Sequence, residues 1–157
     1  MKTEILFPEV ANLCGDLMNV TYLRQCCPEM EVVETGLKDR PAFLDGGVDL
    51  VYVGSATERG LQLMVKALAP YRAELERYVD GGGLMLATGN ALDALGEYVV
   101  IDGKRAFDGL GILKTHAEYH MMKRHNSFLL GSFQDMEIVG FKSLFGHTYP
   151  DDELANP

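Results

Sequence analysis

The stretch GGGLMLATGNALDALG, residues 81–96, decides the fold. Its apolar run, residues 84–87, is typical of a strand, and the glycine-containing turn Thr88-Gly89-Asn90 follows directly. A helix is predicted to begin at Ala91, after this turn. In many α/β enzymes a turn between a strand and a helix presents a nucleophile. This turn contains no cysteine and no serine in a Gly-x-Ser-x-Gly setting.

Strands and helices alternate on the N-terminal side of this unit. Residues 50–53 (LVYV) are apolar on both faces, as in the middle of a parallel sheet. Apolar residues over 60–79 recur at helical spacing, and Pro70 predicts a break within that segment. Further strands are predicted at 5–7 and 31–34, and a helix at about 18–27. This alternation predicts an α/β fold with a mostly parallel, doubly wound sheet.

The last third of the chain predicts β structure of another kind. Residues 98–113 are typical of a hairpin that turns at Asp102-Gly103. The segments 127–133 (SFLLGSF) and 136–149 (MEIVGFKSLFGHTY) are also β-like, and the acidic end PDDELANP indicates a loop or a frayed tail. We therefore expect one domain over residues 1–157, with a β-rich C-terminal third.

Composition excludes several classes of function. The net charge is −9 and no basic run occurs, so nucleic acid is not an expected partner. No apolar stretch reaches the roughly 20 residues of a membrane span, and the N-terminus lacks a secretory leader, which favours a cytoplasmic protein without membrane contact. The three cysteines, Cys14, Cys26 and Cys27, do not have the spacing of a disulfide framework, and we expect them to be small buried or half-buried thiols.

Loops at the carboxyl ends of parallel strands are the expected place for a site. Gly54 and Ser55 follow one such strand and could offer backbone N–H groups to an anion. A purely structural interpretation stays open, because the loop also suits a helix capped by Thr57. Thr88 could act as a weak hydroxyl nucleophile only if a base activated it.

The four histidines are the candidate bases and metal ligands. His116 and His120 are spaced to face one metal ion if their segment were helical, but no third ligand is evident. The segment 114–127 is mixed in charge and predicts a solvated surface that also includes His125. His147 is interpreted as an ordinary strand or loop residue. We expect no metal and no cofactor.

Four regions share a pattern with one enzyme family. They are 6–25 (LFPEVANLCGDLMNVTYLRQ), 48–62 (VDLVYVGSATERGLQ), 78–98 (YVDGGGLMLATGNALDALGEY) and 107–113 (FDGLGIL), the last followed by Thr115, Arg124 and 138–149 (IVGFKSLFGHTY). In these regions the chain resembles the class I glutamine amidotransferase domains of the cobyric acid synthase-like group. The glutaminase subunit of lipid II isoglutaminyl synthase is the closest in pattern. The resemblance implies a three-layer, flavodoxin-like fold.

The resemblance also implies a site, and the chain departs from it. The family attacks the glutamine carboxamide with a cysteine at the turn; Thr88, with one residue inserted after it, or Gly89 stands there, and neither can form a thioester. Asn90 replaces a glycine of the oxyanion turn. The family's ligand-binding loop corresponds to the segment from Gly54 and Ser55 to Arg59.

The family's catalytic histidine lies in a later motif that His147 does not match. The resemblance thus predicts either a truncated, inactive relative of the family or a fragment of a longer chain, in both cases without glutaminase activity.

Three functions are consistent with these features. The first is a pseudoenzyme that acts as a binding or partner subunit, with a Mur-ligase-like synthetase or a second copy as partner and a glutamine-like small molecule as ligand. The second is an active amidotransferase-type enzyme with Thr88 as an altered nucleophile. The third is a module that binds a small polar ligand. Lipid II amidation and cobalamin-related amidation both remain open as pathways.

Overall fold

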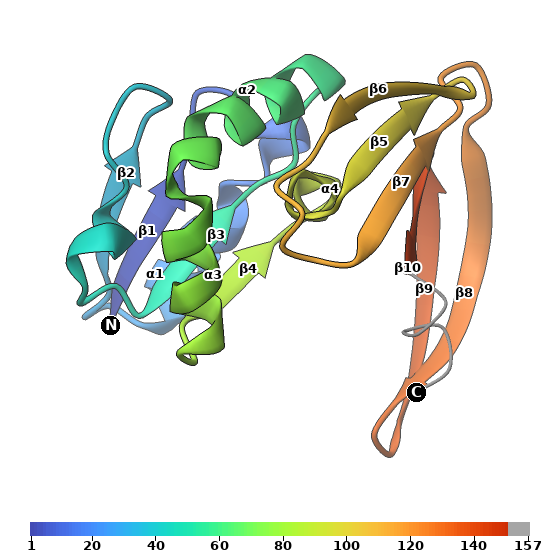
Figure 1. Ribbon diagram of the computed structural model, residues 1–157. Helices are drawn as coiled ribbons and strands as arrows, with labels where there is room; N and C mark the ends of the chain where they lie inside the picture. Colours follow the sequence, from blue (N-terminus) through green and yellow to red (C-terminus); the bar gives the residue numbers. More distant parts are fainter. Residues whose placement is uncertain (151–157) are drawn as a thin grey trace.

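The computed structural model describes residues 1–150, and four parallel strands form its first sheet (Figure 1). The sheet order is β2-β1-β3-β4. The strands are β1 (Lys2–Leu6), β2 (Glu31–Thr35), β3 (Leu50–Val53) and β4 (Leu84–Ala87). The α/β fold and its parallel sheet are therefore confirmed. The first strand ends one residue earlier than predicted, because Phe7 adopts a left-handed backbone with φ of 57°.

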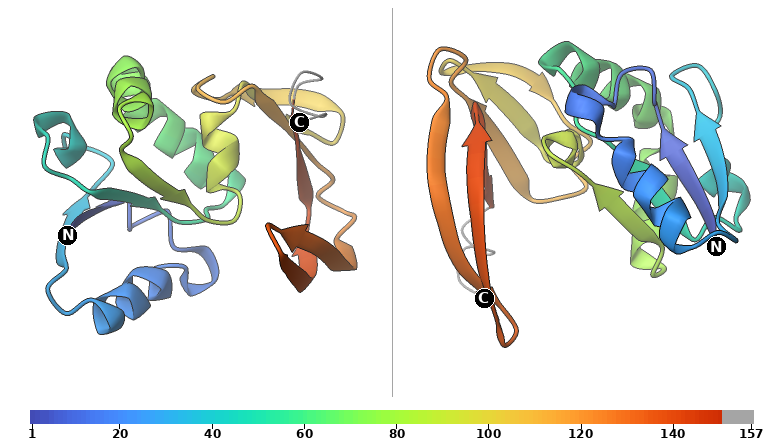
Figure 2. Two further views of the ribbon diagram at one scale, coloured as in Figure 1. Left: turned by 90° about the horizontal axis from the view of Figure 1, so that it is seen from below. Right: turned by 180° about the vertical axis from the view of Figure 1, so that it is seen from behind.

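Helices cover both faces of this sheet. They are α1 (Met18–Cys26), α2 (Glu58–Leu68), α3 (Arg72–Asp80) and the short α4 (Ala91–Leu95), with 3₁₀ turns at Leu13–Gly15, Ala42–Asp45 and Ala69–Tyr71. Figure 2 shows α1 on one face and α2 and α3 on the other. The break predicted at Pro70 is confirmed as the 3₁₀ turn between α2 and α3. Within residues 1–150, every helix is too short or too polar to serve as a transmembrane span.

The second sheet has the order β10-β7-β5-β6. Its strands are β5 (Tyr98–Ile101), β6 (Lys104–Asp108), β7 (Thr115–Tyr119) and β10 (Gly146–Pro150). The hairpin predicted at Asp102-Gly103 is confirmed, with φ of 49° and 79° at its two turn residues, as a two-residue turn with paired positive φ requires. One core joins the two sheets, since Leu6 of β1 and Val99 of β5 belong to the same buried cluster.

The prediction of a solvated surface over 114–127 is wrong for its first half. Residues 115–119 form β7, which lies between β5 and β10 and buries Ala117 and Tyr119. Alternate side chains of β7 point into the core, and those between them lie on the opposite face of the sheet, where polar residues are accommodated. Because most residues in this segment are polar, the alternation of buried and exposed positions was not recognised in the sequence.

A long hairpin completes the described structure. It consists of β8 (His125–Phe133) and β9 (Met136–Leu144), which pair only with each other in a separate two-stranded sheet. Figure 1 shows it beyond the second sheet, on the side away from the parallel sheet. The β-rich last third is thus confirmed up to Pro150, and the rest of the predicted acidic tail lies outside the described residues.

The prediction of buried or half-buried thiols is wrong. Cys14, Cys26 and Cys27 are all free and exposed. Helix α1, which ends at Cys26, buries only Val20, so its C-terminal end lies on the surface. Cys14 lies in the 3₁₀ turn before this helix, in a left-handed conformation with φ of 59°.

Candidate functional site

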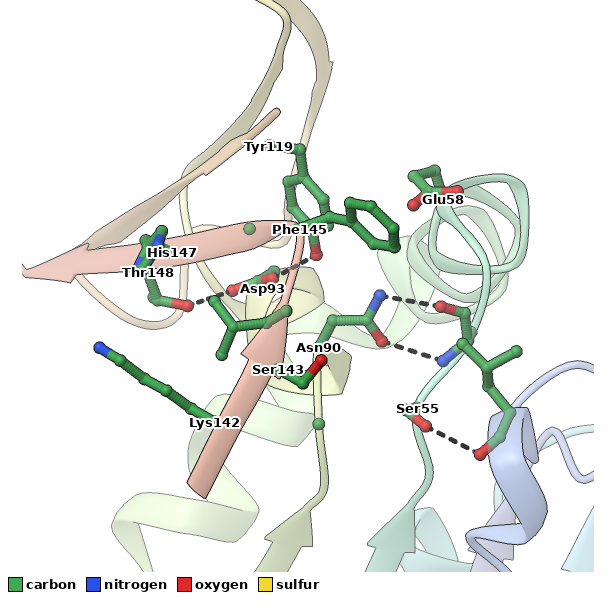
Figure 3. Close-up of a pocket in the computed structure, with 15 residues that line it drawn as sticks. Ser55, Glu58, Asn90, Asp93, Tyr119, Lys142, Ser143, Phe145, His147 and Thr148 are labelled. Atoms are coloured by element: carbon green, nitrogen blue, oxygen red, sulfur yellow. Dashed lines mark hydrogen bonds between the residues drawn. The ribbon is translucent and has the colours of Figure 1, made fainter. Parts of the chain in front are cut away.

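A cavity of about 490 Å³ lies at the carboxyl ends of β3 and β4, where an open α/β sheet is expected to bind ligands (Figure 3). Most of its lining comes from the loop after β3, the turn between β4 and α4, and the end of β9 with the start of β10, and Leu13, Asp93 and Tyr119 complete it. The lining residues are Leu13, Ser55, Ala56, Glu58, Gly89, Asn90, Asp93, Tyr119, Lys142, Ser143, Leu144, Phe145, Gly146, His147 and Thr148. Loops of the parallel sheet, strands of the second sheet and the end of the β8–β9 hairpin therefore all contribute to the cavity.

Gly89 is the residue at the bend between β4 and α4. Its φ is 54°, in the left-handed region that favours glycine. A Cβ atom at this position would lie 2.7 Å from Cβ of Ser55, so the absent side chain also leaves room for the loop after β3. Of the two positions considered for the family's nucleophile, Gly89 is the one with the left-handed backbone of a sharp strand-to-helix turn.

Thr88 does not line the cavity. Its Oγ1 donates a hydrogen bond to Oδ2 of Asp16 at 2.8 Å and lies 3.1 Å from the hydroxyl of Tyr52. The same Asp16 oxygen accepts the backbone N–H of Ser55 at 2.7 Å. Partial burial raises the pKa of Asp16, but the hydrogen bonds from Ser55 and Thr88 outweigh it and leave the pKa lowered. These contacts fix the loop after β1 against the ends of β3 and β4.

Asn90 lines the cavity, but its amide is already engaged. Its Oδ1 accepts the N–H of Ala56 at 3.0 Å, and its Nδ2 donates to the carbonyl of Ala56 at 2.8 Å (Figure 3). This paired contact joins the loop after β3 to the turn after β4. The Asn90 side chain, which replaces a glycine of the family's oxyanion turn, therefore holds these two loops together.

Two of the predicted ligand-binding residues lie outside the cavity lining. Gly54 is buried, and a Cβ there would collide with the carbonyl oxygen of Ala11, so this glycine permits close packing of two loops. Arg59 is exposed on α2. Ser55, Gly89 and Asn90 are the predicted residues that the fold brings together at the cavity.

Asp93 is a cavity residue that sequence reasoning missed. It is 5% exposed, and its Oδ2 and Oδ1 accept hydrogen bonds from the hydroxyls of Tyr119 at 2.5 Å and Thr148 at 2.6 Å. Burial raises the pKa of Asp93 above its ordinary value of 3.8, and the two hydrogen bonds lower it only in part. The available signal was one acidic residue within the otherwise apolar helix ALDAL.

Charges of opposite sign flank the cavity. Figure 3 shows Lys142 and Glu58 on opposite sides of it. His147 also lines the cavity; desolvation lowers its pKa, as do the nearby charges of His125, Lys142 and His120. Its imidazole is therefore neutral near pH 7.

The metal-binding spacing of His116 and His120 is not realised. The ring of His116 stacks between those of Tyr98 and Tyr149, at centroid distances of 5.0 and 5.5 Å. His120 follows the end of β7 and is exposed. Over residues 1–150, no group of three or more His, Cys, Asp or Glu side chains is placed to hold a metal ion.

Comparison with known proteins supports the resemblance at a coarse level. No known protein-family model matches the chain. It is 28% identical over 145 residues to GatD, a subunit of the glutamine-hydrolysing lipid II isoglutaminyl synthase of Staphylococcus aureus (strain N315). This similarity supports a distant, glutamine amidotransferase-like relation. The match includes 89% of this chain and 58% of GatD, so the chain spans less than two thirds of its relative's length.

Proposed function

We propose that the chain is a glutamine amidotransferase-like domain that binds glutamine, or a closely related amino acid, and does not hydrolyse it. The observation that carries this proposal is Gly89, a residue without a side chain, at the left-handed bend beside the cavity. The order β2-β1-β3-β4 of the parallel sheet agrees with a flavodoxin-like frame, which places ligands at this edge.

The absence of hydrolysis follows from the chemistry of the bend. Hydrolysis by a thioester needs a thiolate within reach of the bound carboxamide. Gly89 provides no nucleophile, and none of the chain's three cysteines lines the cavity. Loss of a nucleophile can lower turnover by on the order of a million-fold.

The cavity itself suits a small zwitterion. Its volume of about 490 Å³ lies in the usual range of small-molecule sites, roughly 300–1,000 Å³. Lys142 can pair with an α-carboxylate and Glu58 with an α-ammonium group, because the two side chains lie on opposite sides. The hydroxyl of Ser143 can bind a carboxamide, and the Ser55 hydroxyl, which donates to the carbonyl of Leu13 at 3.2 Å, can still accept a hydrogen bond from its NH₂ group.

Thermal unfolding with added amino acid tests the proposal. We expect glutamine to raise the melting temperature in a saturable way, with a stabilisation of about 2.7 kcal/mol at a hundred times Kd. Lys142→Met should weaken this binding about tenfold or more, since it removes the cation and keeps the bulk. Lys66→Met on α2, exposed and remote from the cavity lining, is the matched control. Equal shifts for both variants, or none with any amino acid, would contradict the proposal.

One observation favours a second candidate, an enzyme with Thr88 as nucleophile. The Thr88 hydroxyl donates to the Asp16 carboxylate, the arrangement that a general base requires. The lowered pKa of Asp16 makes this carboxylate a weak base, so we place the candidate second. Ammonia release from glutamine that is lost in Thr88→Ala and kept in Thr21→Ala, a change on α1, would favour it.

We further infer a synthetase-type partner, because the relative is named as a subunit of a synthase. The same name favours lipid II amidation over a cobalamin pathway. Purification of the untagged chain from its own cell, followed by mass spectrometry, identifies the partner. A ligase that acts on a cell-wall precursor is the expected result, and a cobalamin enzyme would contradict the pathway.

A further inference from the structure

The hairpin of β8 and β9 meets the second sheet at a pair of histidines. The ring centroids of His125, which begins β8, and His147 on β10 lie 5.0 Å apart, and the two rings meet edge to face at 73°. Nε2 of His125 lies 3.1 Å from Oγ of Ser127 on the same strand. Directly before His125, the guanidinium of Arg124 lies 4.6 Å from the ring centroid of Phe145, which links β9 to β10. Within residues 1–150 the hairpin shares no strand ladder with β10, so side-chain contacts of this kind join the two.

The hairpin turns a basic face toward the second sheet. Lys142 of β9 pairs with Ser127 of β8 in register, so Lys142 lies on the same face of the hairpin as His125. Lys142 is half-buried, whereas its neighbour Phe141 on the other face is exposed. The face that carries Lys142 and His125 is therefore the covered one, and it brings cationic groups to His147.

A proton on His147 is disfavoured in this arrangement, here called closed. Desolvation lowers the pKa of His147, and the charges of His125, Lys142 and His120 lower it further. On its own strand, the ring of Tyr149 lies 6.3 Å from that of His147. Because the pKa is lowered, His147 stabilises the closed arrangement fully above its ordinary pKa of 6.5. That contribution is lost as the pH falls through the lowered pKa.

The carboxylates on the elements next to His147 are engaged elsewhere. Glu118 of β7 is its cross-strand neighbour, but Oε1 of Glu118 lies 3.9 Å from Nε2 of His116. Asp93 accepts the hydroxyl of Thr148, whose side chain lies on the opposite face of β10 from His147. The Asp93 contact and the ladder with β7 hold β10 in place, so the hairpin is the part that is free to move.

We propose that protonation of His147 and His125 releases the hairpin from β10, so that the cavity opens at acidic pH. Lys142, Ser143 and Leu144 of β9 line the cavity, so movement of the hairpin removes one of its walls. Each unit by which a pKa is lowered in the closed arrangement shifts the equilibrium toward the open one by about tenfold at acidic pH. Release of a bound amino acid on opening rests on the proposed function, whereas the movement itself does not.

Residual dipolar couplings of the ¹⁵N-labelled full chain, measured without any amino acid, test the proposal. The amides of 125–144 and those of the second sheet should fit one alignment tensor at about pH 7.5 and require two at about pH 5.5, with smaller couplings in the hairpin. His147→Gln removes the titrating ring and keeps a polar side chain, so it should fit one tensor at both pH values. The matched control is His116→Gln, which should respond as the unmodified chain does, because His116 stacks between two tyrosines within the second sheet.

One tensor for the unmodified chain at both pH values would overturn the proposal, as would two tensors already at the higher pH. An acid response that persists in His147→Gln, or is lost equally in His116→Gln, would also overturn it. If His147→Gln does not fold, the titration of the ring protons in the unmodified chain decides the matter. The hairpin amides should shift with the midpoint of the His147 ring, below pH 6.5, and a different midpoint would overturn the proposal. No ligand is present in these measurements, so their failure leaves the ligand proposal standing.

Discussion

At the scale of single residues, Gly89 has two constraints that act together. Its backbone is left-handed, and Cβ of Ser55 occupies the place next to a potential side chain. A family-type cysteine at this bend would therefore have to displace Ser55. Because Gly89 has no side chain, the loop after β3 can place Ser55 against the bend.

Gly89→Ala should lower the free energy of unfolding by about 2–4 kcal/mol, because it combines backbone strain with overpacking. Gly103→Ala is the matched control, since Gly103 also has positive φ but meets nothing within 4 Å of its Cβ position. Chemical denaturation should show a smaller loss there. Adding Ser55→Gly should recover part of the loss in Gly89→Ala only. Equal losses in the two alanine variants would contradict the packing argument.

Asp93 should make stability depend on pH. Its folded-state pKa is raised above the unfolded value, so the folded chain binds the proton more tightly. This contribution is fully present below the unfolded pKa and is lost as pH rises through the folded pKa. As the pH rises above about 4, the native chain should therefore lose stability relative to Asp93→Asn.

Urea denaturation of both proteins at several pH values measures the difference in unfolding free energy. Asp80→Asn, which removes an exposed carboxylate on α3, controls for the change in net charge. A difference between the native chain and Asp93→Asn that stays constant, or grows in favour of the native chain as pH rises, would show that the buried carboxyl does not titrate as described.

At the scale of elements, the site depends on contacts between loops that follow neighbouring strands. Asp16 joins the loop after β1 to Ser55 and Thr88, and Asn90 joins the loop after β3 to the turn after β4. These hydrogen bonds hold the loop after β1, the loop after β3 and the turn after β4 together beside the cavity.

Asn90→Ala should lower the free energy of unfolding by about 1–3 kcal/mol, because it leaves the N–H and carbonyl of Ala56 without their partners. Asn90→Asp keeps an acceptor for the N–H but places a negative charge against the carbonyl, so it should not restore stability. Thermal denaturation of the two variants measures this effect. An unchanged melting temperature in both would mean that water replaces the amide at no cost.

Most elements could be predicted from the sequence, because local apolar runs and breakers set them. The uniformly apolar run of β3, the break at Pro70 and the turn at Asp102-Gly103 are local signals, and the structure agrees with each. Strand β7 was missed because its buried positions alternate with polar ones. The exposure of the cysteines depends on how α1 sits on the sheet, which its own weak apolar pattern does not specify.

The candidate site could be predicted only in part. Ser55, Gly89 and Asn90 were found because the carboxyl ends of parallel strands meet at one edge. Lys142 comes from β9 of the hairpin, and Thr148, the partner of Asp93, comes from β10 of the second sheet; both are more than 45 residues from Asp93 along the chain. No local pattern specifies contacts at that separation, so these residues required the structure.

At the scale of the whole molecule, the chain joins a parallel sheet to a mixed second sheet and a hairpin, and segments from all three line the cavity. The hairpin also contributes to the candidate ligand site, because Lys142, Ser143 and Leu144 of β9 line the cavity.

The most direct test of the central claim is a titration of the ¹⁵N-labelled chain with glutamine, in which protein amides and free amino acid are followed by NMR in the same tube. We predict saturable shifts for amides around the cavity, including Ser55, Gly89 and Phe145, while the glutamine signals persist unchanged. Glutamate that accumulates in proportion to the amount of protein, or cavity amides that do not move at millimolar glutamine, would contradict the account.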